Sequence, residues 1–368
     1  MTKKRVLVAM SGGVDSAVAA ARLVDEGHEV VGVTLHLWDY PEVGDAKAHG
    51  RCCAPEDQYD ARRTADALGF PHFTFDRREL FAKTVVEPFV EAYLTGETPS
   101  PCTACNRGVK LGELAELADR LGASHIATGH YARLGHTDEG APFVREGADR
   151  NKDQSYFLYA IPPAILSRLV FPLGESTKAE VRAEAVARKL PGATKGESQE
   201  LCFVGAGAGA YAAFVEERAG TRRRPGPIVD AEGRVVGQHE GIHRFTVGQR
   251  KGLGVALGKP AFVTTIDPAT GTVTLGDDSA LASTETALDG VVLAAGVSLP
   301  FEARVRVRYR HDGALARVER GATEGTAVVT FRGPVRAVSR GQIAVLYDGD
   351  RVLGGGRIGG PSSGSLPL

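Results

Sequence analysis

The 368-residue sequence lacks the features that would place it in a membrane or outside the cell. It has one tryptophan, two methionines and five cysteines. Its longest stretch without a charged residue, 201–215, is shorter than the roughly 20 apolar residues that a membrane-spanning helix needs. The basic and then apolar start, residues 1–10, is interrupted by Ser11–Asp15, and no small-residue cleavage pattern follows. We therefore expect a soluble, cytoplasmic protein with no membrane partner.

The sequence also lacks an excess of charge of either sign. Lys and Arg number 44 and Asp and Glu 45, so the net charge is −1. A field over the whole surface that would attract nucleic acid is thus excluded, and any basic patch must be local. Apolar residues make up 43% and charged residues 24%, which excludes a mostly disordered chain. At about 150 residues per domain, the length predicts two to three domains.

The cysteines are too few, and odd in number, for a disulfide scaffold. In a reducing compartment such thiols are more often catalytic or metal-binding. Only one CxxC occurs, so a structural zinc site built from Cys52 or Cys53 with that motif lacks a second clean pair. Buried inert thiols are a further alternative. A third is sulfur chemistry, in which one thiol carries sulfur and another resolves a disulfide. The cysteines are Cys52, Cys53, Cys102, Cys105 and Cys202.

Residues 1–205 alternate strand and helix signals. Strands are predicted at 5–10, 29–37, 72–75 and 124–127, and helices at 15–26, 55–68, 77–94 and 106–121. Strands separated by helices predict a parallel sheet, so the fold class is α/β for this first domain. Ligands of such a sheet bind at the carboxyl ends of its strands.

After residue 205 the helical periodicity fades, apart from residues 211–218. Short apolar runs between Gly, Asp-Pro and Thr-Gly turns predict small β-barrels, in a central domain at 206–278 and a C-terminal domain at 284–358. The tail, 359–368, is expected to be loop or disorder. Predicted strands are 228–229, 235–237, 261–267, 272–275, 291–294, 302–309, 314–320, 326–331, 343–347 and 351–358.

A glycine-rich turn, Met10–Ser16, lies between the first strand and the first helix. Gly12 and Gly13 let the backbone turn sharply, and N–H groups at the helix start favour an anion. The Lys of a GxxxxGK[ST] loop is absent, which excludes a kinase-like or GTPase-like site. A β–α turn with Ser and Asp as helix caps is the alternative reading. The six residues SGGVDS resemble the PP-loop of ATP pyrophosphatases, which split ATP between its α and β phosphates.

Further motifs resemble the tRNA-specific 2-thiouridylases along nearly the whole chain. They are PCTACN at 101–106, ATGHY at 127–131, NKDQSYFL at 151–158, CF at 202–203, GQRKGLG at 248–254 and RYR at 308–310. This family thiolates the 2-position of the wobble uridine, position 34, in lysine, glutamate and glutamine tRNAs. The resemblance implies a sulfurtransferase that converts ATP to AMP and pyrophosphate. It also implies a tRNA anticodon stem-loop as partner and a cysteine desulfurase or relay protein as sulfur donor.

The resemblance assigns the cysteines. Cys105, directly before Asn106, matches the family's nucleophile, and Cys202 matches the residue that carries the persulfide; the pair would finish as a disulfide that needs a reductant. Many members have aspartate at the position of Cys102. With cysteine there, Cys102, Cys105 and Cys202 also match the set with which related thiolases hold a [4Fe–4S] cluster. Both mechanisms remain open, and persulfide chemistry is the family's usual description.

The resemblance also implies binding residues. ATP, with Mg²⁺, is expected at Ala9, Met10, Ser11, Gly12, Gly13, Val14, Asp15, Ser16, Leu35 and Gly129. The target base and tRNA are expected at Ser100, Pro101, Cys102, His130, Lys152, Asp153, Gln154, Arg308, Tyr309 and Gln342.

Arginines alternate from Arg304 to Arg310 in a predicted strand. Alternate residues of a strand share one face, so these side chains predict a basic stripe suited to phosphates. A solvated sheet face is the alternative. Arg218, Arg222–Arg224, Arg250 and Lys251 form a second basic region.

Two other functions remain as alternatives. An amidating PP-loop synthetase would need a glutaminase half or an amine-donor site, and the sequence shows neither. A non-catalytic RNA-binding module with a zinc clip belongs to a different class. Pyrophosphate release that depends on tRNA would separate all three.

Overall fold

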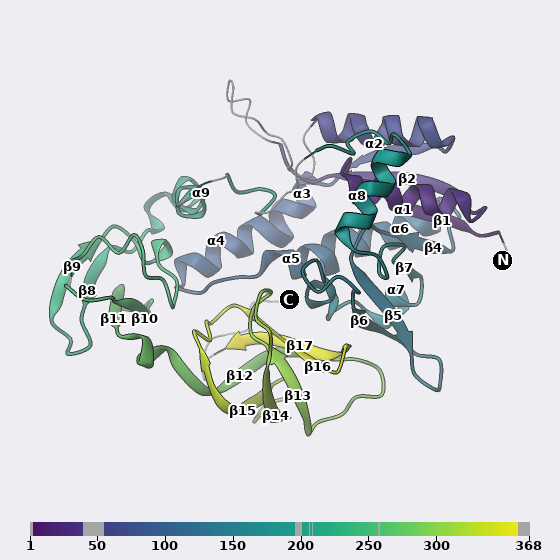
Figure 1. Cartoon of the computed structure of the whole chain (residues 1–368). Coiled ribbons are helices and arrows are strands. Elements are labelled where there is room, and N and C mark those ends of the chain that lie inside the picture. Colours follow the sequence, from purple (N-terminus) through teal and green to yellow (C-terminus); the bar gives the residue numbers. More distant parts are fainter. Residues whose placement is uncertain are drawn as a thin grey trace.

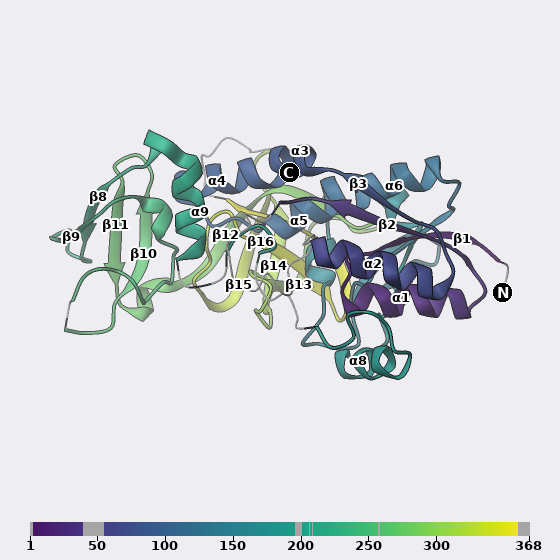
Figure 2. The same ribbon diagram turned by 90° about the horizontal axis from the view of Figure 1, so that it is seen from above.

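The fold was obtained as a computed structural model, which describes residues 3–39, 55–195, 201–205, 207, 209–256 and 258–359. Cys52, Cys53 and the tail after Gly359 lie outside these ranges. Figure 2 shows a small β sheet at one end of the molecule, a parallel sheet at the other and a barrel between them. No helix in the described ranges has both the length and the apolar character to cross a membrane.

The first domain is built on a five-stranded parallel sheet of order β3-β2-β1-β4-β7. Its strands are β1 (Arg5–Ala9), β2 (Glu29–His36), β3 (His72–Asp76), β4 (His125–Ala127) and β7 (Leu169–Val170). Val6, Leu7 and Val8 in β1 are at most 1% exposed, because helices cover both faces of the sheet. The helices that pack on the sheet include α1 (Val14–Asp25), α2 (Pro55–Leu68) and α6 (Leu111–Arg120). Helix α7 (Pro163–Leu166) packs on α6, and α8 (Lys178–Ala187) packs on α1. The predicted α/β class is confirmed.

Two long helical stretches contain π-helical turns. The first runs through α3 (Arg78–Phe81), a π segment (Ala82–Val86) and α4 (Glu87–Leu94). The second begins at α5 (Pro101–Ala104) and continues through a π segment (Cys105–Lys110) into α6. The prediction of a helix start at residue 106 was wrong, because Pro101, which occupies the first helical turn, starts it five residues earlier. The CxxC motif is therefore helical and does not lie on a loop.

The central region consists of α9 (Ala210–Ala219) and a four-stranded sheet of order β10-β11-β8-β9. Ile228, Val263, Val273 and Leu275 form its small core. The strands are β8 (Gly226–Val229), β9 (Val235–His239), β10 (Phe262–Asp267) and β11 (Thr272–Gly276), with 3-10 turns at Gly220–Arg222, Ile242–Arg244 and Asp278–Leu281.

The C-terminal region is a closed antiparallel barrel, because β12 pairs with both β15 and β17. Alternate side chains such as Val305, Val318 and Val329 fill its interior. The strands are β12 (Ala282–Leu293), β13 (Phe301–Arg306), β14 (Ala314–Arg320), β15 (Ala327–Arg336), β16 (Ile343–Asp348) and β17 (Arg351–Gly359). The predicted strand 302–309 ends three residues early, at Arg306, and the predicted strand 291–294 is only the end of the longer β12.

A hairpin joins the first domain to the barrel, and sequence patterns did not predict it. Its strands are β5 (Ala132–His136) and β6 (Pro142–Glu146), and β6 continues the barrel sheet through the pair Arg145–Arg351. Arg133 and Arg145 both bind Asp350 of the barrel, at 2.9 and 2.7 Å. The hairpin thus attaches the barrel beside the carboxyl ends of the parallel strands (Figure 1).

Candidate functional site

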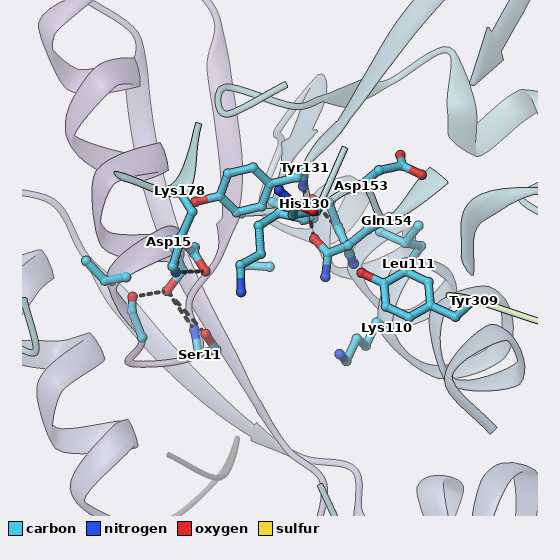
Figure 3. A pocket seen from close by; sticks show the side chains of 18 of the residues that line it. Ser11, Asp15, Lys110, Leu111, His130, Tyr131, Asp153, Gln154, Lys178 and Tyr309 are labelled. Carbon is cyan, nitrogen blue, oxygen red and sulfur yellow. Dashed lines mark hydrogen bonds and ion pairs between the residues drawn. The ribbon is translucent and has the colours of Figure 1, made fainter. Parts of the chain in front are cut away.

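A cavity of about 1340 Å³ lies at the carboxyl ends of β1, β2 and β4. One end is formed by the glycine-rich turn and the other by residues of the barrel. Of the predicted site residues, those that line it are Ala9, Met10, Ser11, Gly13, Val14, Asp15, Ser16, Leu35, Gly129, His130, Lys152, Asp153, Gln154 and Tyr309. The lining residues come from both the first domain and the barrel, as Figure 3 shows for Ser11 and Tyr309.

The glycine-rich turn is held in shape by its own hydroxyl groups. The Ser16 hydroxyl donates to the Gly13 carbonyl (3.0 Å) and accepts from the Ser11 backbone N–H (3.2 Å). Gly12 has φ +74°, and a Cβ there would lie 2.0 Å from the carbonyl oxygen of Asp57, so only glycine fits. No side chain caps α1 at Gly13. The N–H groups of the first helical turn are therefore not capped by a side chain at Gly13, as a helix start that binds an anion requires.

Asp15 is the charged residue of this turn, and two groups from distant segments contact it. The Lys178 ammonium donates to both carboxylate oxygens, at 2.7 and 2.8 Å. The Tyr131 hydroxyl donates to Oδ1 at 2.7 Å. Sequence reasoning missed Lys178, because its local signal, the Thr177–Glu180 capping box, predicts only a helix start.

A second lysine lies on the other side of the turn. Lys195 contacts Asp57 (3.0 Å) and Asp60 of α2. Lys195 and Asp57 line the cavity, whereas Asp60 does not. Burial raises the pKa of Asp57 against the opposing effect of the hydrogen bond from Lys195. Lys195 also has no recognisable local motif in the sequence.

Gly129 and His130 follow β4, and Gly129 packs against the glycine-rich turn. A Cβ on Gly129 would lie 2.9 Å from the backbone of Asp15 and Ser16, so glycine permits this approach. Thr128 Oγ1 lies 2.8 Å from His130 Nδ1. Burial, with a smaller effect of the nearby Lys110, lowers the pKa of His130 to about 3. The imidazole at the cavity is therefore neutral at pH 7.

The segment Lys152–Gln154 precedes a 3-10 turn (Ser155–Leu158). Asp153 is only 4% exposed. Its carboxylate accepts from the N–H groups of Gly147 and Ser155, each at 3.0 Å. Gln154 Oε1 accepts from the Tyr131 N–H at 2.9 Å. Asp153 and Gln154 thus shape the cavity wall, whereas the neighbouring Lys152 is the charged donor of this segment.

The predicted arginine stripe does not exist as one exposed face. Arg306 is 9% exposed and contacts Asp153 at 2.9 Å. Arg304 contacts Glu146 at 2.9 Å and covers the Tyr347 ring. The prediction failed because acidic residues of the first domain neutralise these two side chains. Arg308 and Arg310 follow the end of β13, and the Arg308 guanidinium donates to the Arg336 carbonyl (3.1 Å).

Tyr309 and Gln342 are placed by contacts between the domains. The Tyr309 ring lies 4.6 Å from the Phe157 ring, centroid to centroid. Gln342 Nε2 donates to the Thr98 carbonyl at 2.9 Å and thereby fixes the chain that leads to Ser100 and Pro101. Ser100, Pro101, Arg308 and Gln342 do not line the cavity, and neither does Gly12.

None of the three described cysteines lines the cavity. Cys105 is 5% exposed in the main hydrophobic cluster, and Cys202 packs against the same cluster. Phe203 anchors Cys202, since its ring packs on Phe81, Phe89 and Phe214 with centroid distances of 5.1–5.5 Å. Cys102, in α5, is half-buried.

Metal ligation by these cysteines does not fit the geometry. Within the described ranges, no three His, Cys, Asp or Glu side chains converge on a point where they could hold a metal ion. Cys102, Cys105 and Cys202 therefore do not form a ready three-thiolate site for an iron–sulfur cluster. Asp15 does fit Mg²⁺ bound together with a nucleotide, because one or two carboxylates plus phosphates suffice for that ion.

Comparison with known proteins agrees with this architecture. Residues 4–206 match the family model described as tRNA methyl transferase HUP domain, 212–277 the tRNA methyl transferase PRC-barrel domain, and 289–358 the aminomethyltransferase beta-barrel domain. The tRNA-specific 2-thiouridylase MnmA of Sorangium cellulosum is 63% identical over 358 residues, covering 96% of this chain and 92% of the relative. That of Solibacter usitatus is 46% identical over 372 residues, covering 97% and 100%.

The fold and the glycine-rich turn define a PP-loop ATP-binding protein with two appended β domains. Within that class, the relatives are decisive, because they match at full length. The chain belongs to the tRNA-specific 2-thiouridylase MnmA family.

Proposed function

We propose that this protein catalyses the ATP-dependent 2-thiolation of the wobble uridine of lysine, glutamate and glutamine tRNAs. The observation that supports this best is a continuous cavity, which joins the phosphate-binding turn at Ser11–Ser16 to the barrel residues Tyr309 and Arg310. A nucleotide alone needs only the first end. A substrate that reaches the barrel must be larger, and an anticodon loop fits that description.

In the first step, the turn binds ATP and presents its α-phosphate to an extruded uracil. Extrusion from a single-stranded loop costs less than from a duplex. The uracil 2-oxygen attacks the α-phosphorus, the bond to the β-phosphate oxygen breaks, and pyrophosphate leaves with the electron pair. The N3 proton passes to solvent. Mg²⁺ bound with the nucleotide would neutralise phosphate charge, and Asp15 is the carboxylate that would hold it.

In the second step, AMP makes the oxygen a good leaving group. The terminal sulfur of a Cys202 persulfide attacks carbon 2, AMP leaves, and the Cys105 thiolate attacks the Cys202 sulfur. The products are 2-thiouridine and a Cys105–Cys202 disulfide, which a reductant must reopen. Because Cys105 is buried and neither thiol lines the cavity, the chain around Cys202 must move toward the cavity for this step. A cysteine desulfurase or relay protein supplies the persulfide sulfur.

The test separates the two steps. Purified protein, ATP and an anticodon stem-loop are assayed for pyrophosphate and for 2-thiouridine, with a persulfide donor present. The wild type should form both, Ser11→Ala should form neither, and Cys202→Ser should release pyrophosphate without thiolation. Pyrophosphate release that does not depend on RNA, or full thiolation by Cys202→Ser, would contradict the proposal.

A further inference from the structure

The phosphate-binding turn contains no lysine of its own, although the leaving pyrophosphate develops negative charge there. In GxxxxGK[ST] loops a lysine within the loop supplies this counter-charge. Here the Lys178 ammonium, 163 positions later in the chain than Asp15, lies 2.7 and 2.8 Å from the Asp15 carboxylate. Figure 3 shows it on the cavity side of the turn. The fold thus brings to this turn the cation that the motif lacks.

The backbone of Lys178 is held by contacts that do not involve its ammonium group. Its N–H donates to Asp149 at 2.9 Å, and the Thr177–Glu180 capping box starts α8 directly before it. Arg22 of α1 binds Glu184 of α8 at 2.7 Å, which docks α8 on the helix that follows the turn. This framework holds the start of α8 at the turn while the Lys178 side chain, four methylenes long, can change partners.

Lys195 is less suited to the same task. It contacts two carboxylates, Asp57 and Asp60, which are 7% and 9% exposed. Two buried carboxylates more than compensate one ammonium, so drawing Lys195 away would leave both without their counter-ion. Lys178 contacts the carboxylate of Asp15, which can exchange the ammonium for the magnesium ion of the nucleotide.

We propose that Lys178 is a catalytic residue that binds the β- and γ-phosphates and stabilises the leaving pyrophosphate, with Asp15 holding it in place until nucleotide and Mg²⁺ arrive. This rests on the proposed function. As the bond between the α-phosphorus and the bridging oxygen breaks, the electron pair moves to pyrophosphate, and the ammonium hydrogen bonds strengthen with that charge. An interaction of this kind acts on the transition state more than on ATP binding.

The experiment compares Lys178→Ala and Lys178→Met with Lys189→Met. Lys189 lies just after α8, is exposed and does not line the cavity, so its variant removes one lysine charge away from the site. RNA-dependent pyrophosphate release is measured against Mg²⁺ concentration. We expect both Lys178 variants to lower kcat by about 100- to 1000-fold. We also expect half-saturation at lower Mg²⁺, because the metal no longer competes with an ammonium for Asp15. Lys189→Met should match the wild type.

Other results would overturn the inference. An unchanged kcat would exclude Lys178 from the transition state. A lower kcat with a raised Mg²⁺ requirement would mean that Lys178 only arranges Asp15 for the metal. Failure of both Lys178 variants to fold would make the residue structural. If the wild type itself releases no pyrophosphate with RNA, it is the proposed function that fails.

Discussion

The buried ion pair between Arg306 of the barrel and Asp153 of the first domain should carry much of the stability of this interface. The two side chains lie 2.9 Å apart, and the residues are 9% and 4% exposed. Breaking a buried pair by removing one partner costs about 3–5 kcal/mol, since the other charge stays buried. Asp153 keeps the donors of Gly147 and Ser155. We therefore expect the low end, about 3 kcal/mol, for Arg306→Met.

Thermal unfolding measures this directly. At roughly 2–4 °C per kcal/mol for a domain of 150–250 residues, Arg306→Met should lower the unfolding midpoint by about 6–12 °C. Asp153→Asn should have a similar effect, and the double variant should lose at least about 1 kcal/mol less than the sum. The matched control is Arg332→Met, whose pair with Glu302 is exposed, and it should change stability by less than about 0.5 kcal/mol. If Arg306→Met moves the midpoint no further than the control does, the pair does not stabilise the interface.

Four other variants test three different parts of the molecule. Arg310 is exposed and lines the cavity, so Arg310→Ala should reduce the salt-dependence slope of tRNA binding by about one. Arg308→Ala should change this slope less, since the Arg308 guanidinium already has a partner in the barrel. Equal slopes for the wild type and both variants would argue against both contacts. The folded protein keeps His130 neutral down to about pH 3, whereas the unfolded chain protonates it near its usual pKa of 6.5. The contribution of the neutral imidazole to folding stability is therefore complete above pH 6.5 and is lost as the pH falls. Because His130→Asn removes this titration, the midpoint of urea unfolding should decline less between pH 6.5 and 4 in the variant than in the wild type. An equal decline in both proteins would contradict this. Phe203→Ala removes the anchor of Cys202 from the aromatic cluster and should lower 2-thiouridine formed per pyrophosphate released, while a constant ratio would show that the anchor does not serve sulfur transfer.

Local patterns were sufficient for four of the five strands of the parallel sheet, whereas the two-residue β7 was not predicted. The runs of Val and Leu in β1 and β2, and helix ends at Gly27, Gly69 and Gly122, are encoded within a few residues of one another. The hairpin β5–β6 escaped prediction because its two short strands are only partly buried and show no regular alternation of apolar and polar residues.

The arginine pattern shows the limit of arguments from spacing. Alternation from Arg304 to Arg310 correctly implied that Arg304 and Arg306 share a face of β13, but spacing carries no information about what packs on that face. Glu146 and Asp153 pack there and pair with Arg304 and Arg306, which also line the cavity. A charged side chain on a strand indicates a charged ligand only when no oppositely charged side chain from elsewhere in the fold pairs with it.

The absence of a lysine in the glycine-rich turn was read correctly from the sequence, as evidence against a GxxxxGK[ST] site. It does not follow that the site has no cation. The turn fixes where phosphate charge will lie, because Gly12 and the start of α1 are local features. The compensating charge comes from α8, which packs on α1 through Arg22 and Glu184, and so depends on tertiary structure alone. A motif therefore locates the chemistry of this site, while the fold decides which charged groups of the remaining chain take part in it.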